Sequence, residues 1–415
     1  MKFAICTVSN TSRARTGTLK YLNSLPDMGL ETPMLFLYSK GGCVPHLTLD
    51  VLESVTKEPL AIQLPLSTTM SCYKSMKEYK NGISNFIGMK NSLMYCTVQD
   101  PAISTPLGYN MMDKVSIWSR SGKEHVDAER YMDVMEAFRP DMYQCLGDGE
   151  TNVSSTNKRI QKSIKRSLEM FHKCLERHRQ SEVLKKSGFL ALLEGGYDIS
   201  SRKSYVKEIA ESDVDGYVID GLHSNGPEVE FMEVEKAIPV IREIVKELPE
   251  SKFRVAHGCW SPEAVIQLVE EGIDAFDSSF PFIVTERGAA LTFLYKPGKE
   301  GCDASQAPNG VITSLDNTSN PNASTKENKY EINIEDKKFA DDFGPILKNC
   351  SCCCCKEHTR AYVHHLITNK ELLARVLLMM HNLHHYLQFF KEIRKAVKDN
   401  SLGSLKTRIS QGKTE

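Results

Sequence analysis

The middle of the chain alternates short apolar segments with amphipathic ones, and this alternation limits the fold more than any other feature of the sequence. Strands that are buried on both faces are continuously apolar, and strands that alternate with helices form a parallel sheet. The pattern therefore predicts repeated βα units. We place strands at 189–193, 216–222, 253–258 and 275–280, and helices at 201–211, 228–247 and 262–271.

Three further apolar segments lie earlier in the chain, at 34–38, 93–98 and 142–146. At least seven strands are thus available, and the sequence contains no glycine-rich dinucleotide fingerprint. We therefore predict an α/β protein with a (β/α)8 TIM barrel rather than an open doubly wound sheet. Barrel enzymes keep their catalytic groups at the C-terminal ends of the strands, so polar residues at those ends are the candidates for chemistry.

The composition is that of an ordinary globular protein, with 41% hydrophobic and 25% charged residues. The 52 Lys and Arg residues are balanced by 53 Asp and Glu residues, which excludes a globally basic nucleic-acid binder but not a local basic surface. The chain turns polar soon after Cys6, and no segment reaches the roughly 18–20 apolar residues of a membrane-spanning helix. We expect a soluble, cytoplasmic protein without an integral membrane segment.

Five of the 13 cysteines lie within residues 350–355. Neighbouring cysteines on one short segment cannot readily form disulfides with each other, so the cluster predicts a metal site in an intracellular chain. Three thiolates and one imidazole are a standard tetrahedral zinc set, and the spacing Cys-x-Cys-x-x-Cys can surround one ion. Spacing alone does not assign the ligands, and free thiols are the alternative reading. The histidines that compete for the fourth position are His364, His365, His381, His384 and His385.

The C-terminal motif Cys350-Ser351-Cys352…Cys355-Lys356-Glu357-His358-Thr359-Arg360-Ala361-Tyr362…His381-Asn382 resembles the zinc motif of the tRNA-guanine transglycosylase family. Members of that family are (β/α)8 barrels that exchange guanine for queuine or its precursor at the wobble position, 34, of tRNA. The resemblance implies one structural zinc ion per chain and leaves Cys353 and Cys354 without an assigned role. The zinc ligands that it implies are Cys350, Cys352, Cys355 and His381.

The resemblance covers nearly the whole chain and sets the expected domain organisation. We expect a single transglycosylase-like barrel domain over 1–415, with a zinc-binding subdomain and its helix at 345–395. Residues 297–328 are rich in Gly, Ser, Asn, Asp and Pro, and we predict that they form a low-complexity insertion.

Asp277 is the candidate catalytic carboxylate, because we expect it at the C-terminal end of a barrel strand. The resemblance matches it to the family's aspartate nucleophile, which displaces the base and holds the ribose covalently.

Other positions depart from the catalytic pattern. The segment 95–101 lacks the glycine pair that follows the family's second aspartate, and Asp100 precedes a proline. Ile283 and Glu286 stand where catalytic members carry arginines that contact tRNA.

The expected barrel mouth also departs from the catalytic pattern. Asp148 matches the aspartate that reads the guanine edge, but its flanking residues differ. Glu194 and Asp220 replace residues of the base-recognition turns and add negative charge. We expect Asp277 to be vestigial and the chain to have no catalytic residues of its own.

Two further patterns concern surfaces. Basic residues at roughly helical spacing predict a strip that could follow a phosphate backbone, although a solvated helix face is the simpler explanation. They are Lys158, Arg159, Lys162, Lys165, Arg166, Lys173, Arg177, His178 and Arg179. An apolar stripe from Leu373 to Phe390 is either interior packing or part of a subunit interface.

These departures make the chain most similar to the family's non-catalytic accessory subunits. The resemblance then implies a heterodimer with a catalytic subunit, tRNA bound through that complex, and a cytoplasmic location that also allows peripheral association with the mitochondrial outer membrane. Two alternatives remain open: an active homodimeric transglycosylase that uses Asp277 as its nucleophile, and a zinc-stabilised binding module without a tRNA role.

Overall fold

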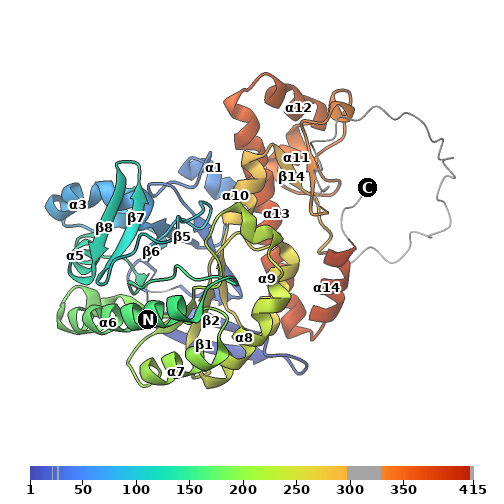
Figure 1. Cartoon of the computed structure of the whole chain (residues 1–415). Coiled ribbons are helices and arrows are strands. Elements are labelled where there is room, and N and C mark those ends of the chain that lie inside the picture. The colour runs from blue at the N-terminus through green and yellow to red at the C-terminus, as the bar shows by residue number, and fades with distance from the viewer. Residues whose placement is uncertain (21, 26–27, 297–328, 412–415) are drawn as a thin grey trace.

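The computed structural model describes residues 1–20, 22–25, 28–296 and 329–411 (Figure 1). Its centre is a closed barrel in which eight parallel strands follow one another in the order β4-β5-β6-β9-β10-β11-β12-β13. Every residue of these strands is buried, as expected for a parallel sheet covered by helices. The strands are β4 (Met34–Tyr38), β5 (Leu60–Pro65), β6 (Ser92–Thr97), β9 (Met142–Gln144), β10 (Gly188–Leu193), β11 (Gly216–Ile219), β12 (Phe253–Ala256) and β13 (Ala275–Asp277).

The predicted TIM barrel is confirmed, and each of the seven predicted strands contributes to it. The eighth strand, β5, was not predicted from the sequence. Its apolar run is interrupted by Gln63 and ends at Pro65, although Gln63 is fully buried in the structure. Several predicted strands end earlier than expected; β13 stops at Asp277 because α10 begins two residues later.

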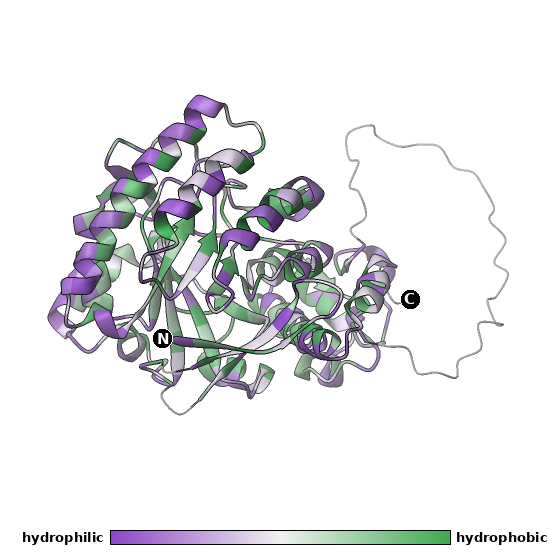
Figure 2. Ribbon diagram, turned by 90° about the horizontal axis from the view of Figure 1, so that it is seen from below, coloured by the Kyte–Doolittle hydropathy of each residue, from purple (hydrophilic) through white to green (hydrophobic). Residues whose placement is uncertain are grey.

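Helices cover the outside of the barrel, with hydrophilic residues turned outward around the hydrophobic strands (Figure 2). The longer helices are α5 (Ala128–Phe138), α6 (Asn157–Gln180), α7 (Ile199–Ile209), α8 (Val234–Glu247), α9 (Pro262–Glu270), α13 (Leu372–Lys398), α12 (Arg360–Thr368) and α14 (Leu402–Ser410). The shorter ones are α1 (Leu49–Val55), α2 (Leu66–Thr69), α3 (Tyr73–Tyr79), α4 (Ile83–Phe86), α10 (Ser279–Glu286) and α11 (Cys353–Glu357). Single 3-10 turns occur at Met70–Cys72, Leu184–Lys186, Pro227–Phe231 and Lys337–Phe339.

An antiparallel sheet of β1 (Lys2–Val8), β2 (Arg15–Lys20) and β3 (Leu30–Thr32) covers the N-terminal end of the barrel. Phe3 packs on Phe253, the first residue of β12, with ring centroids 5.5 Å apart. Arg15 donates from Nε and Nη2 to the buried carboxylate of Asp274, at 2.8 and 2.6 Å. With this end closed, the opposite rim is where the carboxyl ends of the strands meet.

Two hairpins complete the described structure. The first, β7 (Lys114–Ser119) with β8 (Gly122–Asp127), lies between β6 and α5 in the chain. The second pairs β14 (Ala289–Leu291) with β15 (Glu331–Asn333) and packs against α13. The predicted insertion at 297–328 separates β14 from β15 and lies outside the described residues.

The apolar stripe of α13 is interior packing. Leu377, Leu383 and Phe390 are buried, and the helix packs against α10, α12, β14 and α11 of the same chain. The alternative that this stripe forms an interface face is wrong for its central part, because only the first turn is apolar and exposed, at Leu372 and Leu373. Within the described residues, no helix combines the length and the apolar character needed to cross a membrane.

Candidate functional site

The C-terminal rim of the barrel gathers acidic side chains from neighbouring strands. Glu194 and Asp220 follow β10 and β11 directly, and Asp277 is the last residue of β13, as predicted. Asp100 and Asp148 lie a few residues beyond β6 and β9. Several carboxylates in one buried region repel each other unless each is protonated, hydrogen-bonded or paired with a cation.

Asp277 is 1% exposed, and its carboxylate oxygens accept hydrogen bonds from the loop after β12 and from the first residue of α10. Oδ2 accepts from the backbone N–H of Gly258 at 2.7 Å. Oδ1 accepts from the backbone N–H of Ser279 at 2.9 Å and from the Ser279 hydroxyl. The carboxylate therefore ties the end of β13 to the loop after β12, as a structural acceptor does.

A second group of side chains lies beside Asp277. His257 Nδ1 is 3.6 Å from Asp277 Oδ2, and His257 Nε2 is 2.8 Å from the hydroxyl of Tyr95. The sequence analysis did not single out His257, although a polar residue directly after a predicted strand was the available signal. The hydroxyl of Tyr38 donates to Asp100 at 2.9 Å. Burial is the main cause that raises the pKa of Asp100, and the charge of Asp277 adds to it.

Asp148 is fully buried and is held by two arginines of α6. Arg166 Nη1 donates to its Oδ2 at 2.8 Å, and Arg159 donates to both carboxylate oxygens, to Oδ2 at 3.0 Å. The amide of Asn110 also donates to Oδ1 at 2.8 Å. Burial alone would raise the pKa of Asp148, but these cations and hydrogen bonds outweigh it and hold the pKa below its ordinary value. The carboxylate is ionised and already has partners on both oxygens.

Glu194, in contrast to Asp148, lacks partners for its carboxyl group within the described residues. It is fully buried, and neither carboxylate oxygen has a hydrogen-bond partner within the described residues. The nearby Arg202 donates instead to the backbone carbonyls of Leu193, Gly196 and Asp220, each at 2.6 Å. Burial and the charge of Asp220 raise the pKa of Glu194 well above its ordinary value, so the neutral acid is favoured.

The cavity between these groups is small. Its volume is about 50 Å³, and Gln144, Gly149, Asp220 and His257 are among the residues that line it. This volume holds a few water molecules, whereas small-molecule sites typically occupy about 300–1,000 Å³.

The segment that follows β6 is tied across this cavity. The backbone N–H of Thr105 donates to Ser224 O at 2.7 Å, and that of Gly108 donates to Glu150 Oε2 at 2.9 Å. Gly226 donates back to Pro101 O at 2.9 Å. Together with the Asn110–Asp148 contact, these bonds hold the segment after β6 along one side of the cavity.

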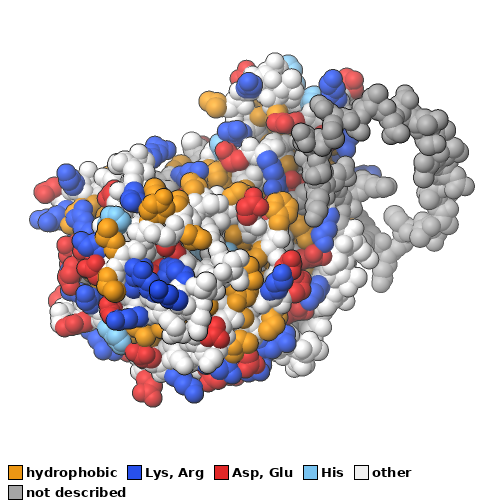
Figure 3. Space-filling model, viewed as in Figure 1, with side chains coloured by type: hydrophobic (Ala, Val, Ile, Leu, Met, Phe, Trp, Pro, Cys, Tyr) orange, Lys and Arg blue, Asp and Glu red, His pale blue; other side chains and the backbone are white. Residues whose placement is uncertain are grey.

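The predicted basic strip on α6 is only partly a surface. Arg159 and Arg166 turn inward to Asp148, Arg177 pairs with Glu129 and Asp133, and the ring of His178 is hydrogen-bonded to Tyr143 at 2.7 Å. The prediction is therefore wrong for these four residues. Basic side chains still gather over α6 in Figure 3, with acidic ones among them. The exposed members are Lys158, Lys162, Lys165, Lys173 and Arg179.

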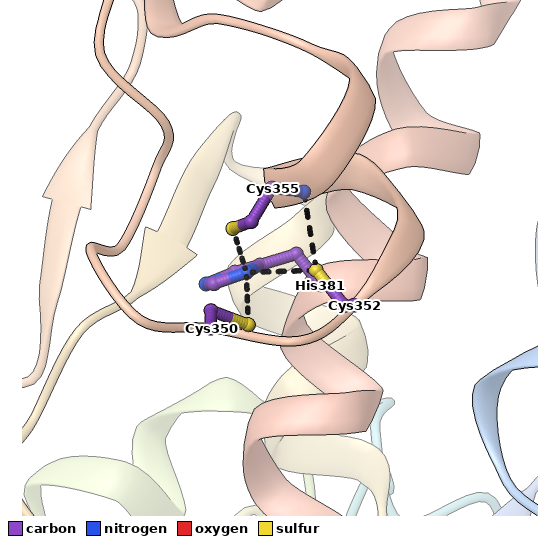
Figure 4. A group of neighbouring side chains, drawn as sticks. All are labelled: Cys350, Cys352, Cys355 and His381. Atoms are coloured by element: carbon purple, nitrogen blue, oxygen red, sulfur yellow. Dashed lines mark hydrogen bonds between the residues drawn. The ribbon is translucent and has the colours of Figure 1, made fainter.

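In the C-terminal part of the chain, the loop before α11, α11 itself and the middle of α13 bring three cysteines to one histidine (Figure 4). The Sγ atoms and a histidine nitrogen all lie within 4.8 Å of one another, so the group could hold a metal ion. Sγ atoms of Cys352 and Cys355 lie against Cys350 and hold the pKa of Cys350 far below its ordinary value, which favours a thiolate there. The members are Cys350, Cys352, Cys355 and His381.

The structure distinguishes between the competing histidines. His381 Nδ1 is 3.8, 3.6 and 3.2 Å from the Sγ atoms of Cys350, Cys352 and Cys355. Its other nitrogen, Nε2, lies 2.8 Å from the carbonyl of Leu291, which orients the ring with Nδ1 toward the sulfurs. Cys353 and Cys354 lie outside the group. The other candidates have different surroundings: His364 and His384 bond to backbone carbonyls, His365 to Asn369, and His385 is buried among aromatic rings.

Two carboxyl groups at the mouth should respond to pH in opposite ways. The raised pKa of Glu194 means that the wild-type protein loses stability as pH rises above about 4.5, the ordinary value, toward the folded-state pKa. We expect Glu194→Gln to raise the free energy of unfolding, and to raise it more at pH 8 than at pH 5.

Asp148→Asn is the matched control for this prediction. The pKa of Asp148 is lowered, so its stabilisation is complete above the ordinary value of 3.8 and is lost only as pH falls below it. This variant should destabilise the protein by a similar amount at pH 5 and pH 8, because it leaves Arg166 buried and without its anion. Urea unfolding at both pH values measures these effects, and a Glu194→Gln gain that does not grow with pH would contradict the prediction.

Comparison with known proteins agrees with this architecture. The sequence model of the family described as queuine tRNA-ribosyltransferase matches residues 9–415. Proteins named queuine tRNA-ribosyltransferase accessory subunit 2 are 38% identical in Homo sapiens, over 99% of both chains, and 38% identical in Gallus gallus, over 99% of this chain and 96% of the relative. The Aedes aegypti protein of that name is 37% identical over 100% of this chain and 93% of its own. The chain therefore belongs to the queuine tRNA-ribosyltransferase family.

Proposed function

We propose that this protein is a non-catalytic accessory subunit that pairs one-to-one with a catalytic queuine tRNA-ribosyltransferase subunit in the cytoplasm. The complex would exchange guanine for queuine at position 34 of tRNA. The observation that carries the proposal is the mouth of the barrel, where Asp148 is saturated by Arg159, Arg166 and Asn110 and the remaining cavity is about 50 Å³. A base that needs Asp148 has neither room nor a free acceptor there.

The retained Asp277 does not oppose this proposal. A nucleophilic carboxylate must reach the sugar carbon with an oxygen lone pair. Asp277 is 1% exposed, and its oxygens accept hydrogen bonds from Gly258 and Ser279. We infer that Asp277 remains as a loop-capping acceptor. The alternative of an active homodimer is favoured only by the position of this residue at the end of β13, beside His257.

We infer that the cysteine and histidine group binds one structural zinc ion. A tetrahedral ion with Zn–S bonds of about 2.3 Å and a Zn–N bond of about 2.0–2.1 Å requires N···S separations of about 3.5 Å. The separations from His381 Nδ1 are 3.2 to 3.8 Å. Three sulfurs and one nitrogen fill all four positions, so the ion would fix α11 to α13 and leave no site for a reactive water.

A candidate surface for the catalytic partner lies on the segment that carries this group. Apolar side chains are exposed there on α12, at the start of α13 and on the preceding loop, and α12 stands apart from the barrel helices in Figure 1. Apolar side chains clustered on a surface indicate a protein contact. They are Phe343, Tyr362, Leu372 and Leu373, exposed by 76%, 40%, 84% and 42%.

The zinc assignment can be tested with two neighbouring thiols. Metal analysis of the purified protein should give about one zinc per chain. Cys352→Ser should lose the metal and unfold the region around α11, because binding energy is also folding energy. Cys353→Ser removes an exposed thiol outside the group and should keep both zinc and stability. A folded, metal-free wild-type protein, or equal metal loss in both variants, would refute the assignment.

The non-catalytic role is tested by base exchange on tRNA. We expect negligible exchange by this chain alone and clear exchange by its mixture with the catalytic subunit. General acid–base assistance alone typically accelerates a reaction by about 10²–10⁴-fold, so base exchange at a site without it should be hard to detect. Asp277→Asn in this chain should leave the rate of the mixture unchanged. If that variant abolished turnover while the heterodimer stayed intact, Asp277 would be a working nucleophile.

The partner surface predicts which variants separate the two subunits. Leu372→Asp/Leu373→Asp places two acids in the first turn of α13, where the helix dipole tolerates them, so the fold should persist. Light scattering of an equimolar mixture should then show monomers instead of a one-to-one heterodimer. Val8→Asp/Met28→Asp changes two other exposed apolar side chains and should leave the heterodimer intact. Loss of association in both double variants would refute the proposal that this surface binds the catalytic subunit.

A further inference from the structure

Another cavity lies at the end of the barrel that is remote from the mouth, between α13 and the first residues of β4 and β5. Its volume is about 230 Å³, somewhat below the range of about 300–1,000 Å³ that is typical of drug-sized ligands. Most of the side chains that line it are apolar, as in sites that hold the apolar part of a small ligand. They include Leu30, Met34, Leu35, Leu60, Leu387 and Phe390.

One cation lies among these apolar side chains. Arg394 is 8% exposed. It follows Leu387 on α13 by seven residues, which is about two helical turns, so both side chains reach the same cavity. Removing a guanidinium from water costs free energy unless hydrogen bonds to acceptors compensate for the lost hydration. The acceptors around Arg394 therefore decide whether a ligand can add to its stability.

Within the described residues, the acceptors of Arg394 are distant ones. Its Nη1 donates to the Pro33 carbonyl at 3.1 Å, its Nη2 is 3.4 and 3.5 Å from the two carboxylate oxygens of Glu58, and its Nε is 3.5 Å from Glu31 Oε2. Strong bonds from a guanidinium to a carboxylate are about 2.7–2.9 Å long. Arg15 reaches a buried carboxylate of this molecule at 2.6 and 2.8 Å. A better-placed carboxylate would thus bind Arg394 more strongly than these acceptors do.

The charges around the cavity do not cancel. Glu58 is shared by Arg394 and by Lys391, whose Nζ is 3.1 Å from Glu58 Oε1. Glu31 is shared by Arg394 and by Lys398, whose Nζ is 3.5 Å from Glu31 Oε1. In this group of described residues, three cations face two carboxylates, and both carboxylates are on exposed side chains where water competes for them. The excess of positive charge favours an anionic ligand at Arg394.

We propose that this cavity binds a small aliphatic carboxylate, with its two oxygens on the guanidinium of Arg394 and its chain against Met34, Leu60 and Phe390. A planar guanidinium suits this two-bond contact. A water molecule takes up about 30 Å³ in the liquid, so the cavity has room for roughly eight groups of that size, which is a chain of about six carbons. The ligand would hold α13, which carries His381, against the start of the barrel. This site does not depend on the proposed function.

The test is isothermal titration of hexanoate, and of its uncharged counterpart hexanamide, into the full-length chain. The wild-type protein should bind one hexanoate per chain and should bind hexanamide at least tenfold more weakly, because hydrogen bonds between charged groups are stronger than those to a neutral group. Arg394→Met removes the charge and keeps an apolar side chain of similar length. In this variant the two compounds should bind with equal affinity, and a surviving preference for hexanoate would overturn the proposal.

Leu387→Trp tests the cavity without changing Arg394. Leu387 is half-buried and lines the cavity, so a larger side chain there should fill the space and abolish binding of both compounds. Lys395→Met is the matched control, because it removes an exposed cation next to Arg394 that does not line the cavity, and both affinities should stay at their wild-type values. Equal binding of the two compounds by the wild-type protein would overturn the carboxylate assignment. Hexanoate binding that persists in Leu387→Trp, or a wild-type protein without saturable binding, would overturn the site itself.

Discussion

Closure of the eight-stranded parallel barrel is the constraint on which the rest of this structure depends. Because every barrel strand runs in the same direction, the residues that follow them meet at one rim, and the N-terminal sheet closes the other end. Acidic residues that are up to 177 positions apart in sequence, from Asp100 to Asp277, thus become neighbours. How each of these carboxyl groups is stabilised then determines what the rim can do.

The acidic residues of the rim are accommodated in different ways. Asp148 is ionised and held by Arg159 and Arg166, Glu194 is held neutral by burial, and Asp277 is bonded to the loops around it. A catalytic site needs groups that are less satisfied in the resting state than in the transition state. Asp148 and Asp277 are satisfied already and Glu194 is held neutral, which is why we interpret the barrel as a scaffold for contact with a partner.

Much of this fold could be predicted from the sequence, because buried parallel strands are continuous apolar runs. The strand β5 was not predicted because Gln63 interrupts its apolar run. The strand β1 was not predicted because its residues alternate between exposed and half-buried. The spacing of Cys350, Cys352 and Cys355 indicated a metal site, but five histidines were compatible with it until the fold brought His381 to the sulfurs. Arg159 and Arg166 resembled surface cations; their seven-residue separation is two helical turns, which places both on the inward face of α6.

The central claim is that the barrel mouth does not accept a purine base. The most direct test is isothermal titration of free guanine and free queuine into the purified chain, with the catalytic subunit as the positive control. We expect no saturable heat for this chain at base concentrations that saturate the catalytic subunit. Stoichiometric binding that is lost in Asp148→Asn would contradict this expectation, because Asp148 would then be reading a base rather than holding two arginines.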